Sequence, residues 1–393
     1  MSIDKDPIVI TGAARTPMGG FQGDLSGLSA SQLGAASIYA AVERSGIAEE
    51  DIDAVIMGCV LPAGQGQAPA RQAAMGSGLP DSTGATTINK MCGSGLKAVM
   101  SAHDEIYCGS HEIIVAGGME SMTNAPYLLS KARQGYRMGH GEVKDHMFLD
   151  GLEDAYDRGK LMGVFAEDCA QHYQFTREAQ DQFAIESLNR ALNADFSSEI
   201  IPVNVKSRKG EEKITVDEQP LKAKPDKIPT LKPAFSKDGT VTAANASSIS
   251  DGAASIVLMR KSEADKRGCK VLASIKGHAT HAQAPEWFTT APVGALKKLY
   301  EKTGWAANDV DLYEINEAFA VVTMAAIQEL SLAHDIVNVN GGACALGHPI
   351  GASGARILVS LITALEQNNL QKGMATLCLG GGEAVAVAIE REQ

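Results

Sequence analysis

Cys92 lies in a stretch whose residue types can support nucleophilic chemistry. Residues 89–99 place this cysteine after a short polar turn and directly before an apolar pattern of helical period. The unpaired N–H groups and the positive dipole end of a helix start favour a thiolate over a thiol. The sequence therefore predicts a Cys92 pKa well below the usual value of about 8.5, and a nucleophile at neutral pH. A small cysteine buried at a tight turn is the alternative.

Three later motifs carry groups that can serve such a nucleophile. His348 stands in a glycine-rich turn before a helical pattern, where an imidazole can take the Cys92 proton. Cys378 ends an apolar strand and can act as a general acid or base on a carbon beside a carbonyl. Asn316 can hold a water molecule or orient a donor at an oxyanion site. The backbone N–H groups of Cys92 and Gly380 are predicted to form a second oxyanion site.

Each of these residues also has a structural explanation. A turn histidine, a buried strand cysteine and a helix-capping asparagine are all ordinary features of folded proteins. The nine histidines show no H-x-x-x-H spacing or carboxylate pairing that predicts a metal, so we expect no metal site. The chain also lacks a G-x-G-x-x-G turn after a strand and a Walker loop.

The elements that must position these groups follow one pattern at both ends of the chain. Short apolar runs alternate with segments of helical period, which predicts a parallel sheet covered on both faces in an α/β fold. The expected strands and helices in the first part of the chain are 8–10, 28–45, 53–58, 70–76, 86–88 and 112–118.

Three stretches of the N-terminal part recur in the same order near the C-terminus, which indicates a duplicated α/β domain. An active site is then expected at the junction of the halves, near strand ends and helix starts. The matched segments are 51–55 with 309–313, 94–95 with 353–354, and 113–120 with 375–383.

Residues 121–250 differ from both halves, because they combine glycine-rich loops with amphipathic helical segments. We therefore expect an insertion, after which an apolar strand at 255–259 rejoins the first half. The predicted domains are 1–120, completed by 251–270, then the inserted loop domain 121–250 and the C-terminal domain 271–393.

Composition narrows the class of protein. The formal net charge of −12 argues against nucleic acid and anionic membrane as partners. No apolar run approaches the roughly 18 residues of a membrane span. The seven cysteines are scattered without C-x-x-C spacing, and the N-terminus lacks the apolar core of a signal peptide. These features predict a cytoplasmic enzyme.

Taken together, the motifs resemble those of the thiolase family over essentially the whole chain, and most closely its bacterial acetyl-CoA C-acetyltransferases. The resemblance implies a duplicated, five-layered αβαβα fold whose inserted loop domain binds coenzyme A and makes tetramer contacts. It also implies a homotetramer that is a dimer of dimers, and no tightly bound cofactor, since CoA is substrate and product. The matching segments are 15–17, 89–99, 117–122, 316–319, 347–351 and 378–382.

The resemblance implies a reversible Claisen condensation of two acetyl-CoA to acetoacetyl-CoA and CoA. Cys92 would carry the acetyl group and Cys378 would exchange the α-proton. His348 and a water on Asn316 would hold the enolate oxygen, and the N–H groups of Cys92 and Gly380 would hold the tetrahedral oxygen.

A broader-range 3-ketoacyl-CoA thiolase of fatty-acid β-oxidation is the main alternative, because it shares every catalytic residue and differs in pocket volume. An inactive lipid-binding or scaffold protein on the same fold is a further alternative. By resemblance, Ser247 would contact the pantetheine arm of CoA. By the same resemblance, five residues with bulky side chains would line the acyl pocket, which favours short acyl chains. Its residues are Leu152, Met162, Phe235, Phe288 and Phe319.

Overall fold

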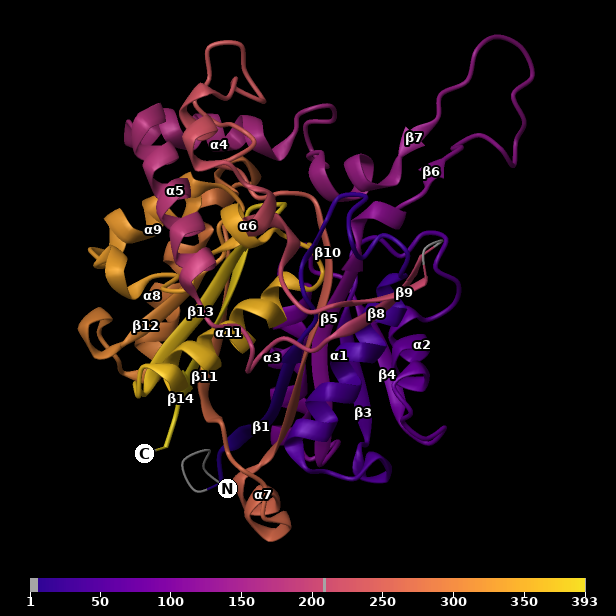
Figure 1. Cartoon of the computed structure of the whole chain (residues 1–393), viewed down its shortest axis with the longest axis vertical. Helices are drawn as coiled ribbons and strands as arrows, with labels where there is room; N and C mark the ends of the chain where they lie inside the picture. The colour runs from indigo at the N-terminus through magenta and orange to yellow at the C-terminus, as the bar shows by residue number, and fades with distance from the viewer. Residues whose placement is uncertain (1–5, 208–209, 393) are drawn as a thin grey trace.

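A ten-stranded mixed sheet runs through the molecule in the computed structural model, which describes residues 6–207 and 210–392 (Figure 1). Its main path has the order β12-β13-β14-β11-β1-β10-β5-β3-β4, and β2 pairs with β10 beside this path. The strands are β1 Ile8–Arg15, β2 Gly19–Gly20, β3 Ala54–Gly58, β4 Gly84–Ile88, β5 Ile113–Ser121, β10 Ser250–Arg260, β11 Ala273–Ala282, β12 Leu312–Ile315, β13 Lys372–Leu379 and β14 Glu383–Glu390.

The two halves of the sheet have the same internal order. β3-β5-β10-β1 in the N-terminal half corresponds to β12-β13-β14-β11 in the C-terminal half. In each half the first pair is parallel and the next two pairs are antiparallel. A short antiparallel contact of β1 with β11 joins the halves. The duplication that the repeated motifs predict is therefore present in the strand topology.

The expectation of a parallel sheet is wrong, because only part of each half is parallel. β10 returns from the insertion and lies antiparallel between β1 and β5. β14 follows β13 through a tight turn and pairs antiparallel with it. Helical crossovers impose parallel pairing, and neither of these two connections is a crossover. Apolar periodicity reports that a strand is buried on both faces, and it carries no information on strand direction.

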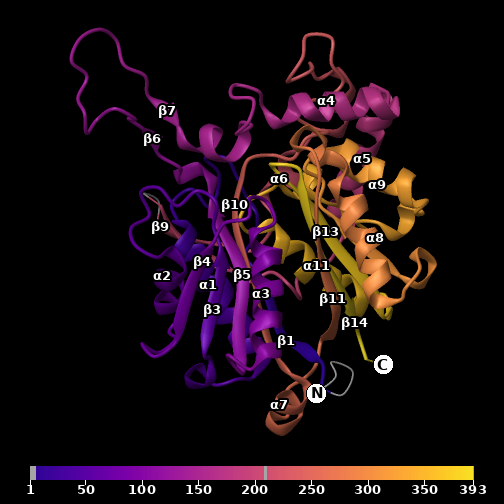
Figure 2. The ribbon, with the colours of Figure 1, turned by 180° about the vertical axis from the view of Figure 1, so that it is seen from behind.

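Helices complete five layers around the two half-sheets (Figures 1 and 2). α3 Ser94–Cys108 and α11 Ser353–Gln367 form the middle layer between the halves, where their apolar side chains share one core with both half-sheets. A separate core lies under α1 and α2 on the N-terminal half, and another lies under α8 on the C-terminal half. The outer helices are α1 Ala30–Ser45, α2 Pro69–Gly76, α8 Ala291–Thr303 and α9 Ala320–Leu330.

The repeated Ser-Gly pair explains how the middle helices pack. A Cβ atom on Gly95 would lie 2.8 Å from the Ala355 nitrogen, and one on Gly354 would lie 2.4 Å from the Leu96 nitrogen. Both distances are too short for any side chain, so glycine lets the starts of α3 and α11 meet backbone to backbone. The loops before these two helix starts, which carry Cys92 and His348, are brought together by this contact.

The segment between β5 and β10 covers one end of the sheet and projects from it (Figure 1). A hairpin of β6 and β7 extends away from the body, and α4 lies across the top of the C-terminal half. None of the helices within 6–207 and 210–392 has the length and apolarity that a membrane span needs. The elements of this segment are η3 Met122–Asn124, β6 Tyr127–Leu128, β7 Lys144–Asp145, η4 Phe148–Leu152, α4 Met162–Tyr173, α5 Arg177–Asn193, β8 Val203–Ser207, β9 Gly210–Ile214, α6 Glu218–Lys222 and η5 Pro225–Thr230.

Buried ion pairs fasten this segment to the sheet. Arg15 at the end of β1 is fully buried, and its Nε lies 2.5 Å from Glu199 Oε1. Its two terminal nitrogens donate to Asp217 at 2.7 and 2.9 Å. Removing one partner of such a buried group leaves an uncompensated charge in the interior, so breaking the arrangement would strongly destabilise the fold. The remaining short elements are η2 Glu49–Asp51, α7 Lys261–Arg267, η6 Pro285–Thr290, η7 Ala307–Asp309, η8 His334–Ile336 and α10 Ala343–Leu346.

Candidate active site

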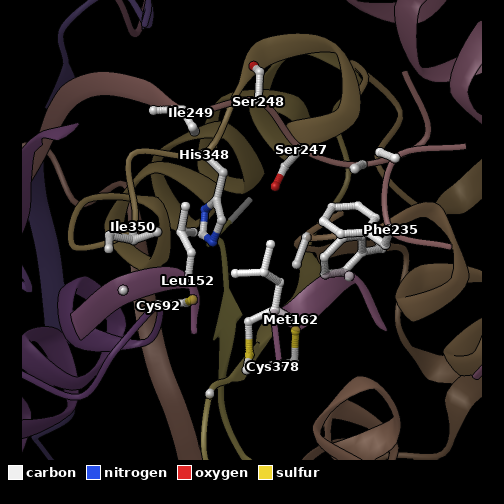
Figure 3. A pocket seen from close by; sticks show the side chains of 18 of the residues that line it. Cys92, Leu152, Met162, Phe235, Ser247, Ser248, Ile249, His348, Ile350 and Cys378 are labelled. Atoms are coloured by element: carbon white, nitrogen blue, oxygen red, sulfur yellow. The ribbon is translucent and has the colours of Figure 1, made fainter. Parts of the chain in front are cut away.

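Cys92 sits in the turn that joins β4 to α3, two residues before the helix begins. The hydroxyl of Ser94 holds this turn, because it accepts a hydrogen bond from the Lys90 N–H at 2.8 Å and donates to the Met91 carbonyl at 2.6 Å. Met91 has a left-handed φ of 47°. This local geometry turns the Cys92 side chain away from the helix and toward a cavity (Figure 3).

The cavity has a volume of about 360 Å³ and a mainly apolar wall (Figure 3). Cys92, His348 and Cys378 all line it, and so does Gly380. Every residue predicted to bind the acyl group or the pantetheine arm also lines it. These residues are Leu152, Met162, Phe235, Ser247, Phe288 and Phe319. The sequence-based site residues therefore lie around one space, with the exception of Asn316.

Burial dominates the electrostatics of Cys92. Desolvation raises the pKa of its thiol to about 11, although the backbone N–H groups of Gly380 and Cys92 act in the opposite direction. The expectation of a pKa below about 8.5 is therefore wrong, because removal from water outweighs the helix start. The backbone N–H groups of Cys92 and Gly380, which the sequence predicts as oxyanion donors, both act on the Cys92 sulfur.

His348 is buried in a defined tautomer. Its Nδ1 lies 2.5 Å from Ser353 Oγ, and that hydroxyl donates its proton to the Pro349 carbonyl at 3.0 Å. Nδ1 must therefore carry the hydrogen of the imidazole, and Nε2 is left with its lone pair. Nε2 is buried and has no partner among the described residues. Burial, with a smaller contribution from Arg356, lowers the His348 pKa to about 3, so the ring is a neutral base.

Cys378 lies at the end of β13, next to the turn that contains Gly380. Its side chain is buried and lines the cavity beside Met162 (Figure 3). Burial raises its pKa well above the ordinary value, and the nearby Cys92 raises it further. The site thus holds two protonated thiols and one neutral imidazole, a set that can pass a proton to an incoming sulfur or carbon.

Comparisons with known proteins agree with this arrangement. The thiolase N-terminal domain matches residues 8–262, and the thiolase C-terminal domain matches residues 269–391. The chain belongs to the thiolase family. It is 48% identical to an acetyl-CoA acetyltransferase of Chromobacterium violaceum over 98% of this chain and 99% of the relative. Acetyl-CoA acetyltransferase 2 of Arabidopsis thaliana is also 48% identical, over 99% and 98% of the two chains.

A solved structure gives the same family. The crystal structure of the Bacillus anthracis acetyl-CoA acetyltransferase superposes with a TM-score of 0.96 at 41% identity, and covers 98% of this chain and 99% of that chain. This thiolase therefore has the same duplicated, five-layered α/β fold as the crystal structure.

Asn316 is buried and does not line the cavity of this thiolase. Its Oδ1 accepts a hydrogen bond of 3.4 Å from Arg356, and the same guanidinium lies 3.5 Å from Glu314. Burial is the main reason that the Glu314 pKa rises to about 8. The Asn316 Nδ2 is buried with no partner among the described residues, so the amide retains free donor capacity.

Sequence reasoning missed several residues of the thiolase cavity and of its support. Ser353, which fixes the His348 tautomer, belongs to the same glycine-rich motif as His348, and its spacing could have identified it. The missed apolar wall has no periodic signal, because it comes from loops and from the ends of short helices. Its members include Phe148, Leu161, Ile249 and Ile350.

Proposed function

We propose that this thiolase is an acetyl-CoA C-acetyltransferase that converts two acetyl-CoA to acetoacetyl-CoA and CoA reversibly, through an acetyl group on Cys92. The observation that carries the proposal is the convergence of two thiols and one neutral imidazole on a single apolar cavity. Full-length relatives named acetyl-CoA acetyltransferase support this activity over the broader-range 3-ketoacyl-CoA thiolase. CoA thioesters are the substrates, and no step below needs another cofactor.

Acylation begins at Cys92. His348 Nε2 takes the thiol proton while the sulfur attacks the thioester carbonyl, and the N–H groups of Cys92 and Gly380 donate to the tetrahedral oxygen. The C–S bond to CoA then breaks, and the departing CoA thiolate takes the proton of Cys378. The products are free CoA and an acetyl-enzyme with imidazolium at His348 and thiolate at Cys378. The attraction of these opposite charges in one apolar cavity raises the pKa of His348 and lowers that of Cys378 from their values in the resting enzyme.

The condensation step restores the protons of Cys378 and Cys92. The Cys378 thiolate removes an α-proton from the second acetyl-CoA, and the enolate oxygen accepts hydrogen bonds from the His348 imidazolium and from a water held by Asn316. The enolate carbon attacks the acetyl carbonyl, and the Cys92 sulfur leaves as acetoacetyl-CoA forms. His348 then returns its proton to Cys92, so all three groups regain their starting states.

The first experiment tests the acyl-enzyme. Intact mass spectrometry after incubation with acetyl-CoA should show one acetyl group per chain, mapped to the Cys92 peptide. Cys92→Ala should carry no acetyl group, and His348→Ala should acquire it more slowly because the thiol loses its proton acceptor. Undiminished acetylation of Cys92→Ala would refute the assignment of the nucleophile.

A second measurement separates the two activities. Thiolysis of acetoacetyl-CoA and of 3-ketooctanoyl-CoA is followed at the enolate absorbance under the same conditions. The proposal expects acetoacetyl-CoA to have the higher kcat/KM. Equal or better thiolysis of the eight-carbon substrate would assign the chain to the broader-range thiolases.

We also propose a cytoplasmic homotetramer, with the projecting β6–β7 hairpin as its contact between dimers. The hairpin displays apolar side chains to solvent, and Met138 is 98% exposed. In the proposed division, residues 121–250 form the CoA-binding loop domain between 1–120, completed by 251–270, and 271–393. Ser247 supports the CoA proposal, since it lines the cavity and its N–H donates to the Ala318 carbonyl at 3.0 Å.

A further inference from the structure

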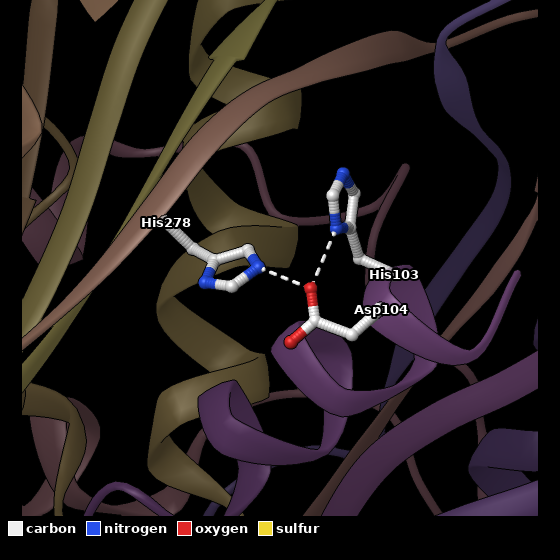
Figure 4. Close-up of side chains that lie close together, drawn as sticks. All are labelled: His103, Asp104 and His278. Atoms are coloured by element: carbon white, nitrogen blue, oxygen red, sulfur yellow. Dashed lines mark hydrogen bonds and ion pairs between the residues drawn. The ribbon is translucent and has the colours of Figure 1, made fainter. Parts of the chain in front are cut away.

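A cluster of two histidines and one aspartate bridges the two halves of the molecule, away from the cavity (Figure 4). His103 and Asp104 lie on α3 of the N-terminal half, and His278 lies on β11 of the C-terminal half. Asp104 Oδ1 is 3.2 Å from His103 Nδ1 and 2.8 Å from His278 Nε2. Nothing in the catalytic proposal uses these side chains.

The geometry is close to that of a three-ligand metal site. The nearest donor atoms of the three residues all lie within 4.8 Å of one another, which holds for no other group of this kind among the described residues. The two imidazole rings are edge to face, with centroids 5.0 Å apart. Ligands at about 2.0–2.2 Å from a tetrahedral Zn²⁺ are roughly 3.3–3.6 Å from each other. Small side-chain shifts are enough to reach that spacing.

We propose that His103, Asp104 and His278 bind one divalent transition-metal ion of the Zn²⁺ class, which links α3 to β11. Two imidazole nitrogens and one carboxylate form a donor set that suits Zn²⁺, with a fourth position for water. The side chains of His103 and His278 are only 8% and 16% exposed, and that of Asp104 is 52% exposed. The nitrogen donors are thus shielded, while the carboxylate leaves a route of access from solvent.

The donor set determines which ions fit. Lys97, Lys302 and Arg260 place positive charge near the cluster, which disfavours every divalent cation alike. Mg²⁺ and Ca²⁺ depend on several oxygen ligands, and the cluster has only one carboxylate. Imidazole nitrogen suits the borderline ion Zn²⁺, which is therefore the ion selected.

The bound ion would stabilise the folded chain and would take no part in the thiolase reaction. Asp104 is ten positions after Ser94, the first residue of α3, which places it about 15 Å along the helix from the end that is next to the nucleophile. A bound ion would join the C-terminal part of α3 to β11 of the other half. The expectation of no metal site came from local sequence spacing, which cannot find this cluster because 174 positions separate Asp104 from His278.

The test is zinc titration of the chelator-treated, reduced enzyme by calorimetry, together with thermal melting. The wild type should bind one Zn²⁺ per chain at this site, and zinc should raise its Tm. Asp104→Asn and His278→Gln should weaken this binding by about 100-fold or more, because outer-shell changes alone cost 10- to 100-fold. Both variants should lose the zinc-dependent rise in Tm.

His111→Gln is the matched control. His111 Nδ1 lies 3.1 Å from Glu105 Oε2, a histidine–carboxylate pair that has no third ligand among the described residues. This variant should bind zinc as the wild type does. The proposal is overturned if the wild type binds no zinc. It is also overturned if Asp104→Asn and His278→Gln bind zinc as tightly as the wild type does, because the ion would then be held elsewhere, for example by cysteine thiols. Retained thiolysis activity in both variants keeps this outcome separate from that of the proposed function.

Discussion

At the scale of single residues, burial opposes the helix start at Cys92. The helix start and two backbone N–H groups favour the thiolate, but desolvation is larger and raises the pKa to about 11. The resting nucleophile is therefore a thiol, and a base must remove its proton during attack. His348 Nε2 is available for this task, because the lowered pKa leaves it unprotonated in the resting enzyme, and this pKa rises as negative charge develops on the Cys92 sulfur.

This protonation state predicts the pH dependence of Cys92 alkylation. With a pKa of about 11, roughly one thiol in ten thousand is ionised at pH 7. Since the thiolate is the reactive form, the rate of iodoacetamide labelling at Cys92 should rise about tenfold per pH unit from pH 6 to 9. Peptide mass spectrometry measures the rate.

His348→Ala serves as the control for this experiment, since it removes the proton acceptor and should leave the same slope. A plateau above pH 7 in the wild type would contradict the raised pKa and restore a preformed thiolate.

Ser353 should matter to catalysis although it does not line the cavity. Ser353→Ala removes the acceptor of the His348 Nδ1–H, so the imidazole can rotate or change tautomer. Loss of this buried hydrogen bond costs about 1–3 kcal/mol, which corresponds to roughly 5- to 150-fold in kcat. KM for acetoacetyl-CoA should change little, because Ser353 does not contact the cavity.

Ser360→Ala is the matched control for Ser353→Ala, because Ser360 is a buried serine on the same helix whose hydroxyl bonds to Glu199. It should leave kcat close to that of the wild type. An equal fall in kcat for both variants would show that Ser353 acts through helix packing only.

At the scale of elements, α4, η6 and the start of α9 form one wall of the cavity. Phe288 of η6 packs edge to face on Phe165 of α4, with ring centroids 6.1 Å apart. Phe235 packs in the same way on Phe319, which precedes α9, at 6.0 Å. Interlocked rings resist displacement, and forcing extra methylenes into such packing costs about 1–3 kcal/mol.

Phe288 is therefore expected to limit acyl chain length. Phe288→Ala should raise the ratio of kcat/KM for 3-ketohexanoyl-CoA to that for acetoacetyl-CoA by about 5- to 150-fold, if the wall costs the wild type about 1–3 kcal/mol. Steady-state thiolysis of both substrates gives the ratio.

Phe183→Ala controls for general loss of packing, since Phe183 is buried against His334 outside the cavity. Each phenylalanine truncation should lower stability by about 3–5 kcal/mol, and only the change at Phe288 should alter the ratio. An unchanged ratio in Phe288→Ala would remove it from the acyl wall.

At the scale of the whole molecule, the β6–β7 hairpin projects from the body (Figure 1), and several of its apolar side chains are exposed. Leu129, Met138 and Val143 are 51%, 98% and 63% exposed. Apolar side chains gathered on a projecting loop are typical of an interface between subunits. Replacing all three by serine should convert the proposed tetramer to dimers, measured by light scattering at micromolar concentration.

The control for the hairpin replaces Val216 and Leu221 by serine, because these residues are 53% and 66% exposed elsewhere on the surface. This pair should not change the mass in solution. A wild-type monomer would refute the tetramer, while tetramers of the hairpin variant would refute the role of the hairpin.

The sequence by itself determined the parts of this thiolase that depend on local residue order. The repeated Ser-Gly pair and the strand motifs predict the duplication, because both halves need the same close helix contact and the same buried strands. The glycine-rich turns around Cys92 and His348 also indicate their positions before helices, since capping and turn formation are local.

Only the tertiary structure decided what depends on distant residues. The segments that pack around them decide the antiparallel pairing of β10, the raised pKa of Cys92 and the tautomer of His348. Desolvation is a sum over all neighbours, and strand direction depends on the path of the connecting chain. The cluster of His103, Asp104 and His278 exists for the same reason, because folding brings α3 of one half against β11 of the other.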